Sequence, residues 1–241
     1  MDQPEGRFRR CDEHAELEVV EPSPSRLMVA EAMILAGAAV AEHGRAVGLA
    51  LPYRSQPSCT LPTAAELDNL PPGAVRHAAL RKGLSRGLTA PQPSPHFSLG
   101  LDAYVQATSP IRRYGDLLTQ RQLAAQLEGG SPLGADQVSA LLEQLDPAIR
   151  QGIQISREDQ RHWQQVWFAE HRSERWEGLF LRWLRPQDGL ALVRLDQLAM
   201  DLPVVVHDSC AAGDGVVVQV KESDPDGDVL RLVARRSAHQ T

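Results

Sequence analysis

The stretch YVQATSPIRRYGDL, from Tyr104 to Leu117, combines hydroxyl-bearing side chains, a Ser-Pro pair and two adjacent arginines. Ser109 is a good N-cap and Pro110 suits a first helical position, which predicts a helix from there to about Glu128. The start of such a helix offers free backbone N–H groups and a partial positive charge. The sequence therefore predicts a place where an anion could bind.

The two arginines support two interpretations, which the local sequence does not separate. Cations are disfavoured in the first turn of a helix, so a bound anion would explain Arg112 and Arg113 there. A guanidinium group suits a phosphate, and Thr108 and Ser109 would add hydroxyl donors. Alternatively, one arginine forms an ion pair with Asp116 and the other is simply exposed.

Composition limits the class of protein. The chain has 241 residues and a net charge of −6, which excludes a protein that coats nucleic acid generally, so a polyanion site would have to be local. Of the 25 Lys and Arg residues 23 are arginine, a bias that a GC-rich coding sequence explains without phosphate binding. Three scattered cysteines and an N-terminus without an apolar signal core indicate a reducing, cytoplasmic location.

One predicted helix, residues 26–43 with Ser25 as its cap, is apolar on nearly every face. This pattern is typical of a centrally buried helix. The apolar run from Leu27 to Ala41 is interrupted by Glu31 and is too short to span a bilayer.

The later part of the chain changes character near Trp176. Before it we predict short helices at 63–69 and 74–83, an irregular Pro-rich loop at 89–100, and helices at 135–145 and 147–175. After it come five short apolar runs separated by turn residues, at 176–184, 189–195, 202–207, 215–221 and 229–235. Five strands at this spacing predict a small barrel.

The longest motif is HFSLGLDAYVQATSPIRRYGDLLTQRQL, at 96–123, and it closely resembles the signature segment of the ribonuclease II/R exoribonucleases, the RNB family. Segments at 25–43, 51–58 and 156–171 resemble further parts of that family. The resemblance implies an α+β fold. Residues 1–175 would be the mainly helical C-terminal portion of an RNB catalytic domain, and residues 176–241 a five-stranded OB-type barrel of the RNA-binding kind.

The resemblance also implies an activity, the 3′→5′ hydrolysis of single-stranded RNA to nucleoside 5′-monophosphates. Family members use magnesium held by a cluster of aspartates, in a channel that admits one RNA strand. By match to the motif, Arg112 would hold the scissile phosphate as negative charge builds up. Arg113 would support the same region. RNA would be the partner, with no DNA or membrane expected.

Several other residues match the family pattern, each with a structural alternative. Glu31 would contact the ribose of the terminal nucleotide, or would be a salt-bridged buried acid. Glu158 would help to clamp the RNA 3′ end, although a solvated helix charge is the preferred interpretation. Tyr104 belongs to the motif and is assigned to RNA binding.

Three more motif residues are interpreted structurally. Tyr114 is expected to pack in the core rather than to stack on a base. His96 is expected to bond the backbone of its own loop rather than to line the channel. Asp116 is expected to orient Arg112 rather than to bind metal.

The chain also departs from the family. We find no aspartate cluster that could hold magnesium, so no metal ligands are identified and the chain would begin partway through the catalytic domain. In-line attack on a phosphodiester by the family's route needs that metal, so the isolated chain is expected to be inactive. The one dense acidic stretch, ESDPDGD at 222–228, is expected to be a turn between two strands.

The predicted barrel is unusual for a nucleic-acid-binding domain. Residues 176–241 contain seven Arg or Lys against ten Asp or Glu, a net charge of −3. Aromatic residues occur only in its first strand, where Trp183 is either a stacking platform or, preferably, a core residue. The barrel would then bind RNA weakly or act mainly as a lid.

Three interpretations of the whole chain follow. The chain is the C-terminal part of an RNB exoribonuclease, which would need the missing N-terminal half of the catalytic domain. Alternatively, it is a non-catalytic RNA-binding or regulatory protein derived from the family, or a helical scaffold that has lost RNA contacts. The first is preferred because the phosphate-side motif is intact.

Overall fold

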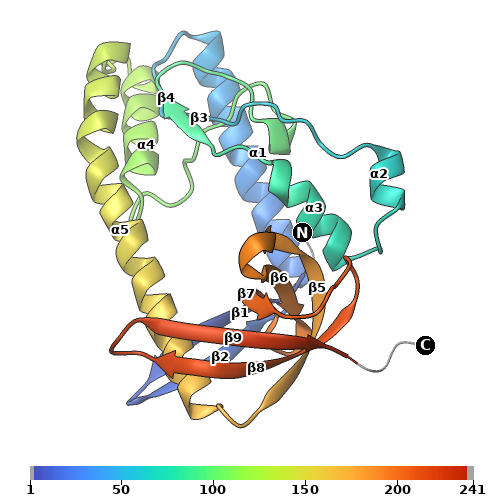
Figure 1. Cartoon of the computed structure of the whole chain (residues 1–241). Coiled ribbons are helices and arrows are strands. Elements are labelled where there is room, and N and C mark those ends of the chain that lie inside the picture. The colour runs from blue at the N-terminus through green and yellow to red at the C-terminus, as the bar shows by residue number, and fades with distance from the viewer. Residues whose placement is uncertain (1–2, 238–241) are drawn as a thin grey trace. The chain divides into compact units, whose positions relative to one another are not determined.

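The structure is a computed structural model that describes residues 3–237 (Figure 1). It is α+β, as predicted, and it divides into two compact units. Unit 1 consists of the chain up to Pro22, Pro62–Lys82 and the chain from Ile153 onward, and unit 2 consists of Ser23–Leu61 and Gly83–Gly152.

Unit 1 contains the predicted barrel. Its strands are β5 (Arg175–Arg185), β6 (Leu190–Leu195), β7 (Met200–Val206), β8 (Gly215–Asp224) and β9 (Val229–Arg236). Short 3-10 helices, Pro186–Asp188 and Asp196–Leu198, precede β6 and β7. The strands close in the order β5-β6-β7-β9-β8. All pairs are antiparallel except β7 with β9. Closure removes every free sheet edge, and the connectivity is OB-like.

The chain before α1 adds a β-hairpin to unit 1. The weak alternation of residues 12–20 predicts the end of a strand there, which corresponds to the second strand of this hairpin. Strands β1 (Glu5–Cys11) and β2 (His14–Val20) pair antiparallel. Phe8 and Ala15 are the buried hydrophobic side chains of this hairpin, and both belong to the barrel's hydrophobic core. The ring centroids of Phe8 and Trp167, which lies on the helix before the barrel, are 5.3 Å apart. The hairpin is therefore integral to this unit.

Two short helices complete unit 1, α2 (Ala64–Asp68) and α3 (Ala74–Gly83), close to their predicted positions. Thr63 and Glu66 form a capping box at the start of α2. The apolar side of α3 packs on the barrel, where Val75 and Ala78 form a small core with Leu181.

Unit 2 is built around α1 (Pro24–Ala46) and α4 (Tyr114–Leu127). A small two-stranded sheet pairs β3 (Tyr53–Ser55) antiparallel with β4 (Leu88–Ala90), the latter at the start of the segment predicted to be an irregular loop. A 3-10 helix covers Phe97–Leu99. The core includes Ala41, Leu51, Tyr53 and Val105. Buried Gln122 of α4 donates to the carbonyl oxygens of Ala50 and Leu133, which ties the helix to two loops.

Helix α1 is not centrally buried, which corrects the prediction. Only Gly37, Ala41 and Gly44 of α1 are buried, whereas large apolar residues such as Met28 (66% exposed) and Leu35 (70%) face outward. Its N-cap is Ser23, whose hydroxyl accepts from the Arg26 N–H, and not Ser25. Apolarity on every side indicated full burial, but only the small residues are used for packing within unit 2.

Helix α1 is also longer than the apolar run inside it. By length and composition alone, α1 is apolar enough to cross a membrane, although it is little buried within the described structure. Residues 27–41 by themselves are still too short to span a bilayer, and it is the longer helix, Pro24–Ala46, that reaches that length. Core helices of ordinary domains pass the same test, so this remains weak evidence.

The two helices predicted after residue 134 form one continuous helix, α5 (Ala135–Glu170), with Pro147 inside it. A proline inside a helix removes one hydrogen bond and costs about 3 kcal/mol. Burial of its apolar face offsets this cost: Val138 and Phe168, near its two ends, are fully buried. The helix ends five residues before the predicted residue 175, where the first barrel strand begins.

Candidate functional site

A turn precedes α4 at the arginine pair, where a helix was expected. The Ser109 carbonyl accepts hydrogen bonds from the Arg112 N–H (3.3 Å) and the Arg113 N–H (3.0 Å). Arg113 is extended (φ −130°, ψ 113°) and is itself the N-cap of the helix, which begins at Tyr114. Ser109 is therefore not the helix cap, and the arginines lie before the first helical turn rather than in it.

Asp116 fixes this turn from inside. Its side chain is 1% exposed, and its Oδ2 accepts from the Ser109 N–H (2.9 Å) and from the Arg113 guanidinium group (2.6 Å). The expectation that Asp116 orients Arg112 is wrong, because the carboxylate pairs with Arg113. A carboxylate in the first turn of α4 also suits the helix dipole.

Arg112 is left displayed by this arrangement. It is exposed, and its one side-chain hydrogen bond among the described residues is a long contact of 3.4 Å to the Ser109 hydroxyl oxygen. It forms no ion pair within residues 3–237. Ile111 at the tip of the turn is fully exposed, and Thr108 at its base is exposed. The guanidinium group of Arg112 is therefore available to a ligand.

Arg113 also keeps donor capacity. One guanidinium nitrogen binds Asp116, but its Nε is buried without a hydrogen-bond partner. Buried polar groups are rarely left unpaired, so this Nε retains a donor that a water or another acceptor can satisfy. The local sequence left the phosphate and ion-pair interpretations open. In this turn Arg113 forms the ion pair with Asp116, whereas Arg112 has no ion pair among the described residues and is available to an anion.

The neighbouring aromatic residues differ in exposure. Tyr104 is half-buried, and its ring lies against Gly37 of α1, where an added Cβ would come within 2.5 Å of Tyr104 Cε2. Tyr114 is 41% exposed, so the prediction that it packs in the core is wrong. Tyr104 therefore serves as packing for α1, and the exposed ring at this end of α4 is Tyr114.

The main chain of His96, rather than its ring, makes the printed hydrogen bond within its loop. Its main-chain N–H donates to the Leu101 carbonyl oxygen (2.8 Å), and the expected bond from the ring to the loop backbone stays a prediction. Its ring contacts Tyr104 edge-on, at 5.8 Å between centroids, and its buried Nδ1 has no partner among the described residues. Burial, and then the charge of Arg54, lowers the pKa of His96, so the ring is neutral at neutral pH.

The two predicted glutamates lie in different units. Glu31, in unit 2, is exposed on α1 and forms no ion pair among the described residues, so the buried-acid alternative is wrong. Glu158, in unit 1, is exposed on α5 and accepts from the Gln154 amide (2.8 Å), as expected for a solvated helix charge. Whether either acid contacts RNA stays a prediction.

The described residues do not fit the magnesium that the resemblance implied. Within residues 3–237 no three His, Cys, Asp or Glu side chains converge on a common point. Asp116 is already bonded to a cation and a backbone N–H, whereas magnesium takes near-octahedral oxygen ligands. No metal chemistry is assigned to this turn.

The acidic stretch at 222–228 forms the end of β8 and the hairpin turn that leads to β9, which agrees with the predicted turn between two strands. The Asp224 side chain accepts from the Gly227 N–H (3.1 Å). Asp228 pairs with Arg161 and accepts from the Gln165 amide (2.8 Å), both on α5. These acids hold the hairpin to the helix. In the same unit, Trp183 is partly buried against the barrel core, which favours the packing interpretation.

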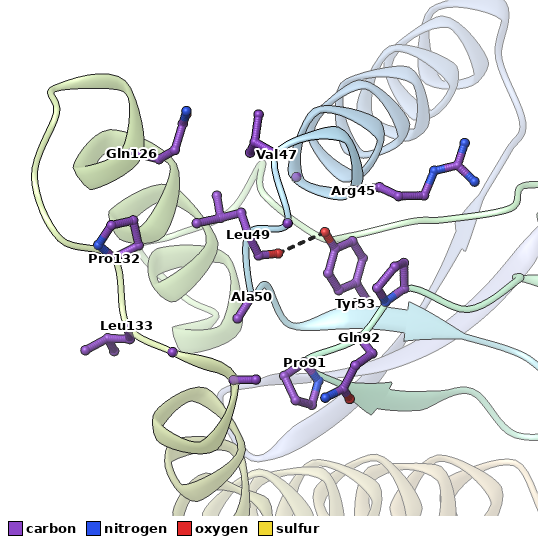
Figure 2. A pocket seen from close by; sticks show the side chains of 15 residues that line it. Arg45, Val47, Leu49, Ala50, Tyr53, Pro91, Gln92, Gln126, Pro132 and Leu133 are labelled. Carbon is purple, nitrogen blue, oxygen red and sulfur yellow. Dashed lines mark hydrogen bonds between the residues drawn. The ribbon is translucent and has the colours of Figure 1, made fainter.

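The sequence analysis missed a cavity of about 460 Å³ in unit 2, which Figure 2 shows from close by. The C-terminal end of α1, the loop after β4 and the start of α5 line it. Buried Tyr53 lies in its wall and donates to the Leu49 carbonyl oxygen (3.1 Å), and burial raises the pKa of Tyr53. None of the predicted site residues lines this cavity.

The comparison with known families decides the class of protein. The RNB domain matches residues 1–129, more than half of the chain, including α1 and the arginine turn. The chain therefore belongs to the RNB family, as the sequence indicated.

The relatives agree with this assignment. The chain is 40% identical over 223 residues to an uncharacterized ribonuclease of Synechocystis, a match that spans 92% of this chain and 34% of the relative. It is 30% identical over 207 residues to the chloroplastic and mitochondrial ribonuclease II of Arabidopsis thaliana, with 84% and 25% covered. The chain thus spans about a third or less of these two curated relatives.

Solved structures confirm the fold. Mycoplasma genitalium RNase R, in complex with ribose-methylated single-stranded RNA, matches with a TM-score of 0.76 at 17% identity, covering 95% of this chain and 45% of RNase R. At this identity the likeness shows the fold alone, including the mixed helical and barrel architecture.

Proposed function

We propose that this chain is part of an exoribonuclease that hydrolyses single-stranded RNA from the 3′ end and releases nucleoside 5′-monophosphates. Membership in the RNB family and the ribonuclease relatives support this assignment. The observation that carries it is the arginine turn, which lies inside the family match and leaves Arg112 unpaired in a fixed turn.

The turn would hold the scissile phosphate. During phosphodiester hydrolysis negative charge grows on the non-bridging oxygens, and a guanidinium group placed beforehand stabilises it. Arg112 supplies that group, and the partly exposed guanidinium group of Arg113, held by Asp116, adds positive charge beside it. The hydroxyl groups of Ser109 and Thr108 complete the set. Ser109 Oγ accepts from Arg112, so its own proton remains available to a phosphate oxygen.

Magnesium would neutralise charge and activate water in the complete enzyme. Since the described residues do not fit it, we propose that its aspartate ligands come from further RNB sequence, in a longer polypeptide or a second chain. The present chain by itself is then inactive. Glu31 and Glu158 remain candidate contacts to the terminal nucleotide, one in each unit.

The test is RNA binding by Arg112→Ala against a matched control. Arg121→Ala removes another exposed arginine of the same unit, on α4, which has no ion pair among the described residues. We expect Arg112→Ala to weaken binding of a single-stranded oligoadenylate and to lower the salt slope by roughly 0.7, the loss of one phosphate contact. Equal affinity and slope for Arg112→Ala, Arg121→Ala and the parent would refute the phosphate contact.

A second candidate, a non-catalytic RNA-binding protein derived from the family, is favoured by the lack of a metal cluster within residues 3–237. Both candidates predict RNA binding through Arg112. They differ when the rest of an RNB domain is supplied by co-expression. If monophosphates are released in the presence of magnesium only when both parts are present, the chain is part of an exoribonuclease. If the mixture releases none, the chain is a non-catalytic RNA-binding protein.

Cytoplasmic residence is part of the same proposal. The three cysteines are free thiols, with Cys11 exposed and Cys210 buried, as is usual in a reducing compartment. Cell fractionation with an antibody to the chain tests it, and recovery with membranes would contradict it.

A further inference from the structure

Positive charge is concentrated in one part of this acidic chain. Residues 43–115 contain eight Arg or Lys and three Asp or Glu, a net charge of +5. Because the whole chain carries −6, the remainder carries −11. The arginine turn accounts for only two of the eight cations, so most of this excess lies elsewhere.

The excess is centred on residues 69–101, which contain no acidic residue. This acid-free segment carries four Arg or Lys. One of them, Arg76, is engaged with the Leu70 carbonyl oxygen (2.9 Å) and with Asp68 (3.6 Å). The other three are exposed and form no ion pair among the described residues: Arg81, Lys82 and Arg86.

The barrel shows the opposite pattern. Its residues 176–241 carry a net charge of −3. Four of its seven cations are in ion pairs with its own acids, at distances of 3.0 to 3.4 Å: Arg185, Arg194, Arg231 and Arg236. Arginines that already form ion pairs, in a domain with a net negative charge, bind a polyanion poorly. The barrel is therefore the weaker candidate for contact with an RNA backbone.

Helix stability explains part of the acid-free segment, but not all of it. Arg81 and Lys82 lie in the last turn of α3, where the helix dipole favours cations. Arg86 lies outside any helix or strand and gains nothing from that dipole. An exposed cation that has no ion pair among the described residues, in a segment without acidic residues of its own, is available to a phosphate.

We infer that three exposed cations of the acid-free segment, Arg81 and Lys82 in unit 1 and Arg86 in unit 2, each bind the sugar–phosphate backbone of single-stranded RNA, at positions other than the scissile phosphate. The inference rests on the proposed function, since it assigns a second contact to the same RNA. Contacts of this kind carry no sequence information and add affinity that falls with salt.

The experiment compares two triple variants of the full chain with equal charge change. One is Arg81→Gln/Lys82→Gln/Arg86→Gln. The control is Arg175→Gln/Lys221→Gln/Arg235→Gln, three exposed cations without ion pairs among the described residues. Binding of a short single-stranded oligoadenylate is measured across a salt series, and circular dichroism verifies that each variant is folded. Three lost phosphate contacts lower the salt slope by about 2.

We expect that fall in the segment variant and an unchanged slope in the control. Arg86→Gln alone, which does not affect the helix, should lower the slope by about 0.7. Equal changes in both triple variants would reveal only general electrostatics and overturn the inference. An unchanged segment variant beside a weakened Arg112→Ala would overturn it while the proposed function stands. No RNA binding by the parent chain would refute both.

Discussion

The buried carboxylate of Asp116 should decide whether the arginine turn keeps its shape. Asp116→Asn preserves the size of the side chain but removes its charge. The carboxylate oxygen at present accepts from the Ser109 N–H (2.9 Å) and from Arg113 (2.6 Å), and the group is 1% exposed. An amide in this place cannot neutralise Arg113, and its NH₂ group would face a donor in one of its two orientations.

The expected loss of stability in Asp116→Asn depends on how exposed the Asp116–Arg113 ion pair is. Removing one partner of a buried ion pair costs about 3–5 kcal/mol, and a single hydrogen bond to a charged group is worth about 1.5–3 kcal/mol. The Arg113 side chain is 32% exposed, so water can solvate part of the unpaired charge. We therefore expect a loss of about 2–3 kcal/mol in the free energy of unfolding, closer to the value of one hydrogen bond to a charged group than to that of a fully buried ion pair.

The assay has to report on unit 2, which contains the arginine turn. Tryptophan fluorescence does not, because all four tryptophans lie in unit 1: Trp163, Trp167, Trp176 and Trp183. Hydrogen exchange of the Ser109 amide, which donates to Asp116, gives a direct readout, and urea unfolding followed by circular dichroism gives the free energy. Glu128→Gln, an exposed acid at the end of α4, is the control and should change stability by less than about 0.5 kcal/mol. Unchanged Ser109 exchange and unchanged stability in Asp116→Asn would show that the carboxylate does not hold the turn.

Three further outcomes are expected. Gly37→Ala should destabilise the chain by about 1–3 kcal/mol in urea unfolding, because its Cβ would collide with the Tyr104 ring. Gly152→Ala, whose Cβ would meet open space, is the control and should be neutral or stabilising. Equal effects of the two variants would contradict the close packing of Gly37. The hydrogen bond from His14 to Glu170 raises the pKa of His14, so its stabilisation is complete below the unfolded pKa of about 6.5 and is lost as pH rises through the higher folded value. An NMR titration in which Glu170→Gln leaves the His14 pKa unchanged would contradict that cause. The outward apolar side of α1 should bind a hydrophobic dye or promote association, and a monodisperse chain without dye binding in ultracentrifugation would contradict this.

The barrel was predictable because its signals are local. Each strand is a short apolar run, and each connection contains the Gly, Pro or Asp residues that turns need, so pattern and structure coincide. The hairpin turn at 222–228 follows the same logic. The first strand, Glu5–Cys11, was missed because only Gly6 and Phe8 on it point toward the core, and three arginines obscure the alternation.

The start of α4 was not predictable from cap residues. Ser109 followed by Pro110 is a good helix start on local criteria, and the Ser109 carbonyl does accept two hydrogen bonds. The Ser109 N–H, however, is taken by a buried carboxylate seven residues on, and Arg113 becomes extended. A hydrogen bond from the Ser109 N–H to the Asp116 side chain leaves no periodic pattern in the sequence. The motif therefore predicted which residues matter but not the turn that they form.

Helix α1 shows how an apolar sequence can mislead about burial and still be informative. Its packing face consists of small residues, with Gly37 against Tyr104 and Gly44 against Tyr53, which lets the helix approach its unit closely. The large side chains are therefore left on the other side, where Leu35 is one helical turn from Glu31. Large exposed apolar residues on a helix are unfavourable in water unless another surface covers them. If further RNB sequence covers them, the same segment that supplies the metal ligands would also surround Glu31, and this acid would then acquire the buried environment that its sequence context predicted.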